Sequence, residues 1–172
     1  MLKFTVYKKT VCLLCIFTSL WATACLASPS ADIKFDDVVK KAQALSQEPF
    51  DTTKNTLAQP LKEIGYDEWR GLRFNTAKTL WANELFSVQF FHPGFIYQYP
   101  VIINSIDKRR STQIPFSTDL FTYPENKYKD LLMEQVGFAG FRVHYPLNSP
   151  TYADELISFL GASYFRALGK NL

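Results

Sequence analysis

The chain has 172 residues, of which 47% are hydrophobic and 20% charged, and this composition is typical of one globular domain rather than of a disordered or fibrous protein. Its net charge of +3 comes from Lys3, Lys8 and Lys9, because the remaining residues hold 16 basic and 16 acidic side chains. This even balance excludes a nucleic-acid-binding protein, which needs a clustered basic surface. The 15 Phe and 9 Tyr favour β-strands, where flat rings pack on half-buried surfaces.

Residues 1–27 have the pattern of a secretory signal peptide. A basic start is followed by an apolar run at residues 11–24 and then by small residues. The run is shorter than the roughly 20 residues that a membrane-spanning helix needs. We expect cleavage between Ala27 and Ser28, because the mature chain then begins with a polar segment. The sequence therefore predicts an exported, periplasmic protein.

All three cysteines, Cys12, Cys15 and Cys25, lie within this leader. The mature chain is therefore expected to contain no disulfide and no thiolate ligand. Cys25 follows Ala22-Thr23-Ala24, which offers an alternative cleavage site and a degenerate version of a lipid-attachment pattern. A lipid anchor at Cys25 remains the minor alternative to a freely exported chain.

The first predicted element of the mature chain is a short helix at about residues 36–47. Its apolar residues recur at helical spacing, as Phe35, Val38, Val39, Ala42 and Leu45. Asp36 and Asp37 lie in its first turn, where the helix dipole favours negative charge, and Pro49 follows its end. Residues 50–62 are predicted to be a polar connector, and a second short helical turn is predicted from Tyr66 to Arg70.

The spacing of apolar residues then changes to the alternation of strands. Phe86, Val88 and Phe90 alternate with polar residues up to a turn at residues 92–94. A further strand is expected to begin at residues 101–103, with a hairpin tip at residues 108–111 and a return strand at residues 114–116. Another loop is expected at residues 124–127.

The C-terminal part of the chain continues this pattern. Phe141, Val143 and Tyr145 alternate with Arg142 and His144. Residues 156–168 fit either a helix or a strand, and Gly161 with the pair Tyr164-Phe165 favours a strand. The sequence thus predicts a mainly β chain, arranged as an antiparallel sandwich after one short helix.

No residue pattern indicates a cofactor, a metal or a catalytic residue. The two histidines, His92 and His144, lack the spacing of metal ligands, and His92 is interpreted as a turn residue. The acidic pairs are adjacent in sequence, as in Asp154-Glu155, whereas glycosidases separate their carboxyl groups across the sugar. Aromatic residues interleaved with arginine, at residues 142–145 and 163–166, suit either a carbohydrate cleft or a hydrophobic core.

Several segments of the chain resemble the periplasmic glucan biosynthesis protein G/D family (MdoG/OpgG and OpgD). They run in collinear order and cover most of residues 35–172: FDDVVKKA at 35–42, LRFN at 72–75 with LW at 80–81, QFFHPG at 89–94, GFAGFRVHYPLN at 137–148, and FLGASYFRALGK at 159–170.

The resemblance implies that residues 28–172 form the N-terminal portion of a large antiparallel β-sandwich of the galactose-mutarotase-like supersandwich type. Family members are roughly three times as long, and their later immunoglobulin-like domain has no counterpart in this chain. The family's catalytic acid is expected in the missing part, so no catalytic residue is transferred. Tyr164, Arg166 and Arg142 match family positions that would line a glucan-binding cleft.

The function implied is the biosynthesis of osmoregulated periplasmic glucans, β-1,2-linked glucose polymers, by binding or processing the glucan. Some family members resemble β-1,2-glucan hydrolases, and the partners implied are the polysaccharide and, indirectly, the glucan synthase pathway of the inner membrane. Two alternatives stay open at this point: a shortened, non-catalytic remnant, and a generic exported carbohydrate-binding or interaction protein.

Overall fold

The computed structural model of the chain describes residues 32–52, 57–124, 127–129 and 137–171. The expected signal peptide, its Ala27–Ser28 cleavage site and Cys25 lie outside these residues, as does part of the loop expected at residues 124–127. Within the described part, no helix combines the length and the apolar character that crossing a membrane would require.

The helices are α1 (Phe35–Ser46), α2 (Gln59–Lys62) and α3 (Tyr66–Gly71). Helices α1 and α3 confirm the predictions made for these segments. The carboxylate of Asp37 accepts a hydrogen bond of 2.9 Å from the backbone N–H of Lys34, and this bond caps the N-terminus of α1. Helix α2 falls in the predicted polar connector, and its Leu61 is fully buried, so this connector is more ordered than the sequence indicates.

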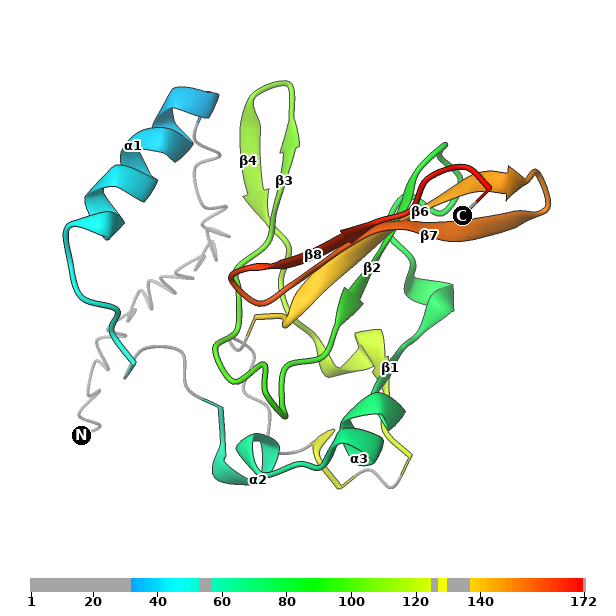
Figure 1. Ribbon diagram of the computed structural model, residues 1–172, viewed down its shortest axis with the longest axis horizontal. Helices are drawn as coiled ribbons and strands as arrows, with labels where there is room; N and C mark the ends of the chain where they lie inside the picture. The colour runs from blue at the N-terminus through cyan, green and yellow to red at the C-terminus, as the bar shows by residue number, and fades with distance from the viewer. Residues whose placement is uncertain (1–31, 53–56, 125–126, 130–136, 172) are drawn as a thin grey trace, which may run out of the picture.

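Four antiparallel strands form the main sheet, in the order β2 (Ser87–Phe91), β6 (Gly140–Ser149), β7 (Tyr152–Leu160) and β8 (Tyr164–Ala167). Figure 1 shows β6, β7 and β8 as successive passes of the chain, with β2 beside β6. The prediction of a mainly β chain with an N-terminal helix is therefore confirmed.

Residues 156–168, which the sequence analysis treated as one strand, are divided between β7 and β8. The two strands pair antiparallel, with Ile157 opposite Ala167 and Leu160 opposite Tyr164. Gly161 starts the turn between them with φ of 60°, a left-handed conformation that glycine adopts without strain. The strand character is confirmed, and the extent of the strand is corrected.

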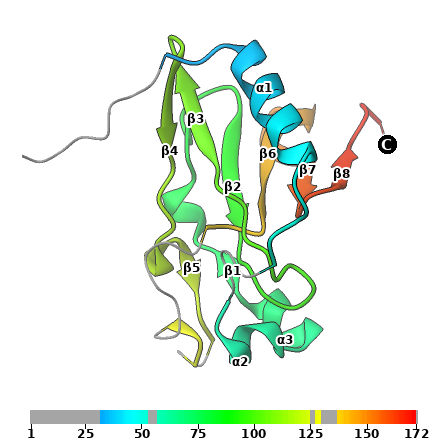
Figure 2. The same ribbon diagram turned by 90° about the vertical axis from the view of Figure 1, so that its left-hand side faces the viewer.

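Two small two-stranded sheets complete the fold: β1 (Arg73–Phe74) with β5 (Phe121–Thr122), and β3 (Asn104–Asp107) with β4 (Arg110–Gln113). Short 3-10 helices precede β2 and β5, η1 (Thr76–Lys78) and η2 (Thr118–Leu120). The β3–β4 hairpin lies toward the same end of the molecule as α1, and β1, β5, α2 and α3 lie toward the other (Figure 2).

The predicted hairpin tip is confirmed, because Lys108 and Arg109 form it with φ of 46° and 67°. The strand expected to begin at residue 101 begins instead at Asn104. Val101 forms an isolated bridge with Phe138, so its backbone is paired before the hairpin starts.

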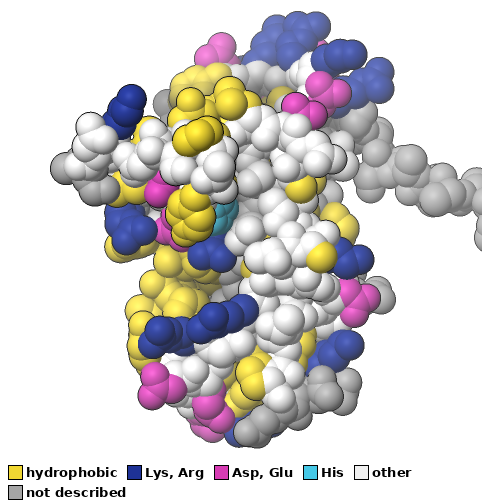
Figure 3. Space-filling view, turned by 90° about the vertical axis from the view of Figure 1, so that its right-hand side faces the viewer, with side chains coloured by type: hydrophobic (Ala, Val, Ile, Leu, Met, Phe, Trp, Pro, Cys, Tyr) yellow, Lys and Arg dark blue, Asp and Glu magenta, His cyan; other side chains and the backbone are white. Residues whose placement is uncertain are grey.

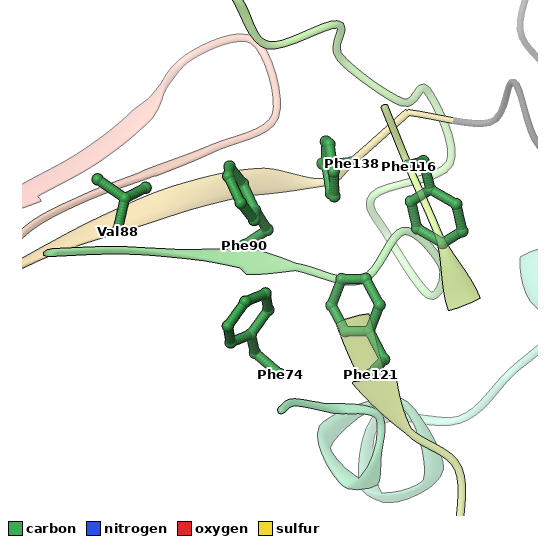
Figure 4. Packing of buried hydrophobic residues seen from close by; sticks show 6 residues of the cluster. All are labelled: Phe74, Val88, Phe90, Phe116, Phe121 and Phe138. Atoms are coloured by element: carbon green, nitrogen blue, oxygen red, sulfur yellow. The ribbon is translucent and has the colours of Figure 1, made fainter. Parts of the chain in front are cut away.

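The core consists largely of phenylalanine rings. Phe90 and Phe138 stack with centroids 4.5 Å apart, and Phe74 meets Phe121 edge to face at 5.8 Å. Figure 4 shows these rings converging from β1, β2, β5 and the segment that leads into β6. A second cluster packs beneath α2 and α3, from Leu57, Leu61, Ile64, Leu72 and Tyr128. Together, these clusters hold the four-stranded sheet against the segment that carries α3 and β1.

Candidate functional site

One face of the four-stranded sheet carries a continuous row of polar side chains. Gln89, Arg142, Ser158 and Arg166 are direct cross-strand partners on β2, β6, β7 and β8. Because neighbouring residues across a sheet point to the same side, these four lie on one face, which we call the polar face. The adjacent row on this face is Phe91, Gly140, Leu160 and Tyr164.

The structure thus brings together all three residues that the sequence analysis selected. Arg142, Tyr164 and Arg166 lie on the polar face, although they come from two strands that are not neighbours: Arg142 lies on β6, and Tyr164 and Arg166 lie on β8. Tyr164 is 49% exposed. Its ring is therefore accessible rather than part of the core.

Arg142 is the centre of a hydrogen-bond network on the polar face. Its Nε and Nη2 donate to Oε1 of Gln89 at 3.2 and 2.8 Å, and its Nη1 donates to Oε2 of Glu155 at 3.2 Å. Arg166 donates from Nη2 to the other carboxylate oxygen, Oε1 of Glu155, at 3.1 Å. Gln89 in turn donates to Oγ1 of Thr79 at 3.2 Å. The network therefore links one side chain from each of the four strands on the polar face.

Glu155 belongs to this network, and sequence reasoning missed it. In the sequence it is recognisable only as one member of the adjacent acidic pair with Asp154. A register shift between Val143 and His144 leaves Leu156 as an extra residue, so that Ile157 faces Val143 while Glu155 faces His144. This irregularity brings Glu155 to the polar face. Strict alternation from Ser158 would place it on the opposite face, so no local pattern could have found it.

A pocket of about 400 Å³ opens beside Arg142. The guanidinium of Arg142 lies 5.4 Å from the centre of the Phe91 ring, a distance at which a cation is attracted to a ring face. The lining comes from α3, β1, β2 and β6: Trp69, Arg70, Leu72, Arg73, Phe74, Thr76, Phe90, Phe91, His92 and Arg142.

An aromatic group lies next to this pocket. Trp69 of α3 contacts Tyr97 with ring centroids 5.2 Å apart, and its Nε1 donates to the backbone oxygen of His92 at 2.8 Å. Burial raises the pKa of Tyr97, and the nearby Tyr164 and Tyr66 raise it further. The sequence analysis selected neither Trp69 nor Tyr97, because both come from loops and short helices without a strand pattern.

His92 is a buried residue that precedes the turn at residues 94–97, which corrects its interpretation as a turn residue. It is 1% exposed, and its Nδ1 lies 2.6 Å from the backbone oxygen of Pro93, so Nδ1 carries the proton and donates it. Nε2 then accepts from the hydroxyl of Tyr123 at 3.1 Å. Burial lowers the pKa of His92 to about 4, so the ring is neutral at neutral pH. The residues that the structure describes contain no group of three metal-ligating side chains.

Chemically, the polar face combines the exposed ring of Tyr164 and the half-buried ring of Phe91 with guanidinium groups and a carboxylate, while the amide of Gln89 and the hydroxyl of Ser158 are buried beneath them. Figure 3 views the side toward which the β6–β7 hairpin points, where Lys and Arg side chains lie above and below a hydrophobic area at mid-height. Rings of this kind pack on the apolar faces of sugars, and the polar groups can bond hydroxyls. The arrangement is suited to binding a carbohydrate.

Comparison with known proteins gives a consistent relationship. The family described as "Periplasmic glucan biosynthesis protein, MdoG" matches residues 33–172. A protein named "Glucans biosynthesis protein G" from Ralstonia nicotianae is 41% identical over 149 residues, covering 84% of this chain and 30% of that protein. Proteins of the same name from Vibrio cholerae and Bradyrhizobium diazoefficiens are 42% and 43% identical over 137 and 133 residues. The chain covers 25% and 26% of their lengths, so it spans less than a third of each of these relatives.

Proposed function

The chain belongs to the MdoG family of periplasmic glucan biosynthesis proteins, and from this premise we propose that it binds β-1,2-glucan in the periplasm through the polar face. The observation that carries the proposal is the convergence of Arg142, Tyr164 and Arg166 on one face of the sheet. The exposed ring of Tyr164 supplies a stacking surface, and the guanidinium groups supply donors for hydroxyl oxygens.

The accompanying parts of the proposal concern location and architecture. Removal of residues 1–27 by cleavage between Ala27 and Ser28 would release the chain into the periplasm. The four-stranded sheet would be part of a larger antiparallel β-sandwich of the galactose-mutarotase-like type. The glucan synthase pathway of the inner membrane is an indirect partner in this proposal, since it would supply the polymer.

We assign binding, and no catalytic residue. Cleavage of a glycosidic bond uses two carboxyl groups on opposite sides of the bond, about 5–10 Å apart. In the part of the polar face that the structure describes, the network contains one carboxylate, Glu155, and each of its oxygens accepts a hydrogen bond from a guanidinium. Purified chain incubated with linear β-1,2-glucan is therefore expected to generate no new reducing ends.

Calorimetric titration with linear β-1,2-glucan tests the proposal. Tyr164→Ala is expected to weaken binding by about 1–3 kcal/mol, the scale of losing one aromatic contact. Phe165→Ala is the matched control, because Phe165 is the next residue, is 67% exposed and lies on the opposite face of β8. The Phe165→Ala variant is expected to bind linear β-1,2-glucan with the affinity of the wild type.

Two results would overturn the proposal. Equal affinities of the wild type and Tyr164→Ala, with both folded, would remove Tyr164 from the binding surface. The absence of any binding by a folded wild-type chain would favour the alternative of a shortened, non-catalytic remnant.

A further inference from the structure

In the part of the chain that the structure describes, the lining of the pocket beside Arg142 contains three arginines and no acidic residue. Arg70 comes from α3, Arg73 from β1 and Arg142 from β6. The guanidinium of Arg142 is bonded to Gln89 and Glu155. Arg70 and Arg73 form no side-chain hydrogen bond or ion pair with any other described residue. Among the described residues, two arginines that line this pocket therefore have guanidinium groups without a partner.

The acidic residues closest in sequence do not neutralise this charge. Asp67 and Glu68, which precede Arg70 on α3, line a different pocket, where Glu68 forms a 3.1 Å ion pair with Lys127. Glu155 is shared between Arg142 and Arg166, and these three groups together keep one positive charge. The described residues of the pocket and of the adjoining part of the polar face therefore carry a net positive charge.

A neutral glucan contains no group that matches two unpaired guanidinium groups. Guanidinium forms its strongest pairs with planar or tetrahedral oxygen anions, through two parallel N–H donors. The pocket also has aromatic walls, which include Trp69 and Phe91. The chemistry of this pocket fits a carboxylate or a phosphate ester.

We propose that this pocket binds an acidic substituent carried by the glucan, while the sugar chain lies on the polar face. The inference rests on the proposed function. It goes beyond that function by stating that the chain distinguishes substituted from unsubstituted glucan. Arg142 joins the two surfaces, because it lines the pocket and also belongs to the network on the polar face. A substituent next to a sugar bound on the polar face would therefore reach Arg70 and Arg73.

The test compares two chemically modified samples of one linear β-1,2-glucan, with the same chain length and degree of substitution. One sample carries carboxymethyl ethers and the other carries neutral hydroxyethyl ethers. In low salt, the wild type is expected to bind the carboxymethyl glucan about tenfold more tightly, the scale of a charge-assisted pair. This preference is expected to shrink in high salt, because the pair is partly exposed to solvent.

The double variant Arg70→Gln/Arg73→Gln is expected to lose the preference and to keep the wild-type affinity for the hydroxyethyl glucan. The control is Lys108→Gln/Arg110→Gln, which removes the same charge from the β3–β4 hairpin and is expected to keep the preference. Circular dichroism and urea unfolding establish that both variants are folded.

Equal affinity of the wild type for the two glucans would overturn the inference and leave the proposed function intact. An equal loss of preference in the two double variants would also overturn it, because the effect would then reflect net charge rather than the pocket. Failure of the wild type to bind either glucan would contradict the proposed function, and the inference with it.

Discussion

Arg142 on β6 and Glu155 on β7 form a 3.2 Å ion pair across a register shift in the sheet. Regular alternation along β7 would direct Glu155 away from Arg142. The extra residue, Leu156, rotates the strand and brings the carboxylate to the polar face, where it also pairs with Arg166 at 3.1 Å. A local irregularity thereby organises charged groups on three strands.

Glu155→Gln is expected to lower the free energy of unfolding by about 1 kcal/mol, because it leaves two guanidinium groups without their anion. The Glu155 side chain is 23% exposed, so solvent only partly replaces the lost pair. Urea unfolding measures the change. Glu84→Gln, at an exposed site without an ion pair among the described residues, is expected to change it much less. Equal losses in the two variants would contradict a stabilising role for Glu155.

Gly140→Ala is expected to lower the free energy of unfolding by about 1–3 kcal/mol through overpacking. A Cβ at this position would collide with the backbone oxygen of Phe159 and lie 2.9 Å from its carbonyl carbon, on the neighbouring strand. Gly65→Ala is the control, since its Cβ would meet no atom within 4 Å, and its cost is expected to stay below about 1 kcal/mol. If Gly140→Ala were as stable as Gly65→Ala, the result would contradict the close approach of β6 to β7 at Gly140.

Stability is expected to depend on the protonation of His92. Its pKa in the folded chain is about 4, below the usual 6.5, so the unfolded chain binds more protons between these two pH values. The stabilisation is therefore fully present above pH 6.5 and is lost as the pH falls to about 4, in total about 3 kcal/mol.

Urea unfolding between pH 4 and pH 7 measures this slope, and His92→Gln provides the comparison because it keeps a polar group and cannot titrate there. The variant is expected to retain only the smaller slope that comes from the carboxylates. Identical slopes for the wild type and His92→Gln would show that His92 does not titrate on unfolding.

Export is expected to remove residues 1–27, since they have the basic start and apolar run of a signal peptide. N-terminal sequencing of periplasmic material should begin at Ser28. Chain retained with Met1 would refute export, and a lipid-modified N-terminus at Cys25 would support the minor alternative.

The elements that could be predicted from sequence are those specified by local patterns. Helix α1 follows from five apolar residues at helical spacing, and the β3–β4 tip follows from a polar stretch between strands. Helix α2 was missed because its four residues include Pro60 and lack a helical pattern, and Leu61 is buried by contacts distant in sequence. The turn within residues 156–168 depends on Gly161, which the sequence analysis used only to favour a strand.

The candidate site was only partly predictable, for a similar reason. Arg142, Tyr164 and Arg166 lie within strands whose alternation and family resemblance could be seen in the sequence. Glu155 reaches the site through a register shift, and Trp69 reaches it because α3 packs beside the end of β2. Both depend on contacts between distant segments, which no local pattern encodes.

The central claim, that glucan lies on the polar face, is tested most directly by nuclear magnetic resonance of the chain titrated with linear β-1,2-glucan. The guanidinium Nε–Hε signals of Arg142 and Arg166 are expected to shift with saturation, while that of Arg110, on the distant hairpin, is expected to stay unchanged. Saturable shifts confined to the rings of Phe159 and Phe165, on the opposite face of the sheet, with no change at Arg142 or Arg166, would contradict the account.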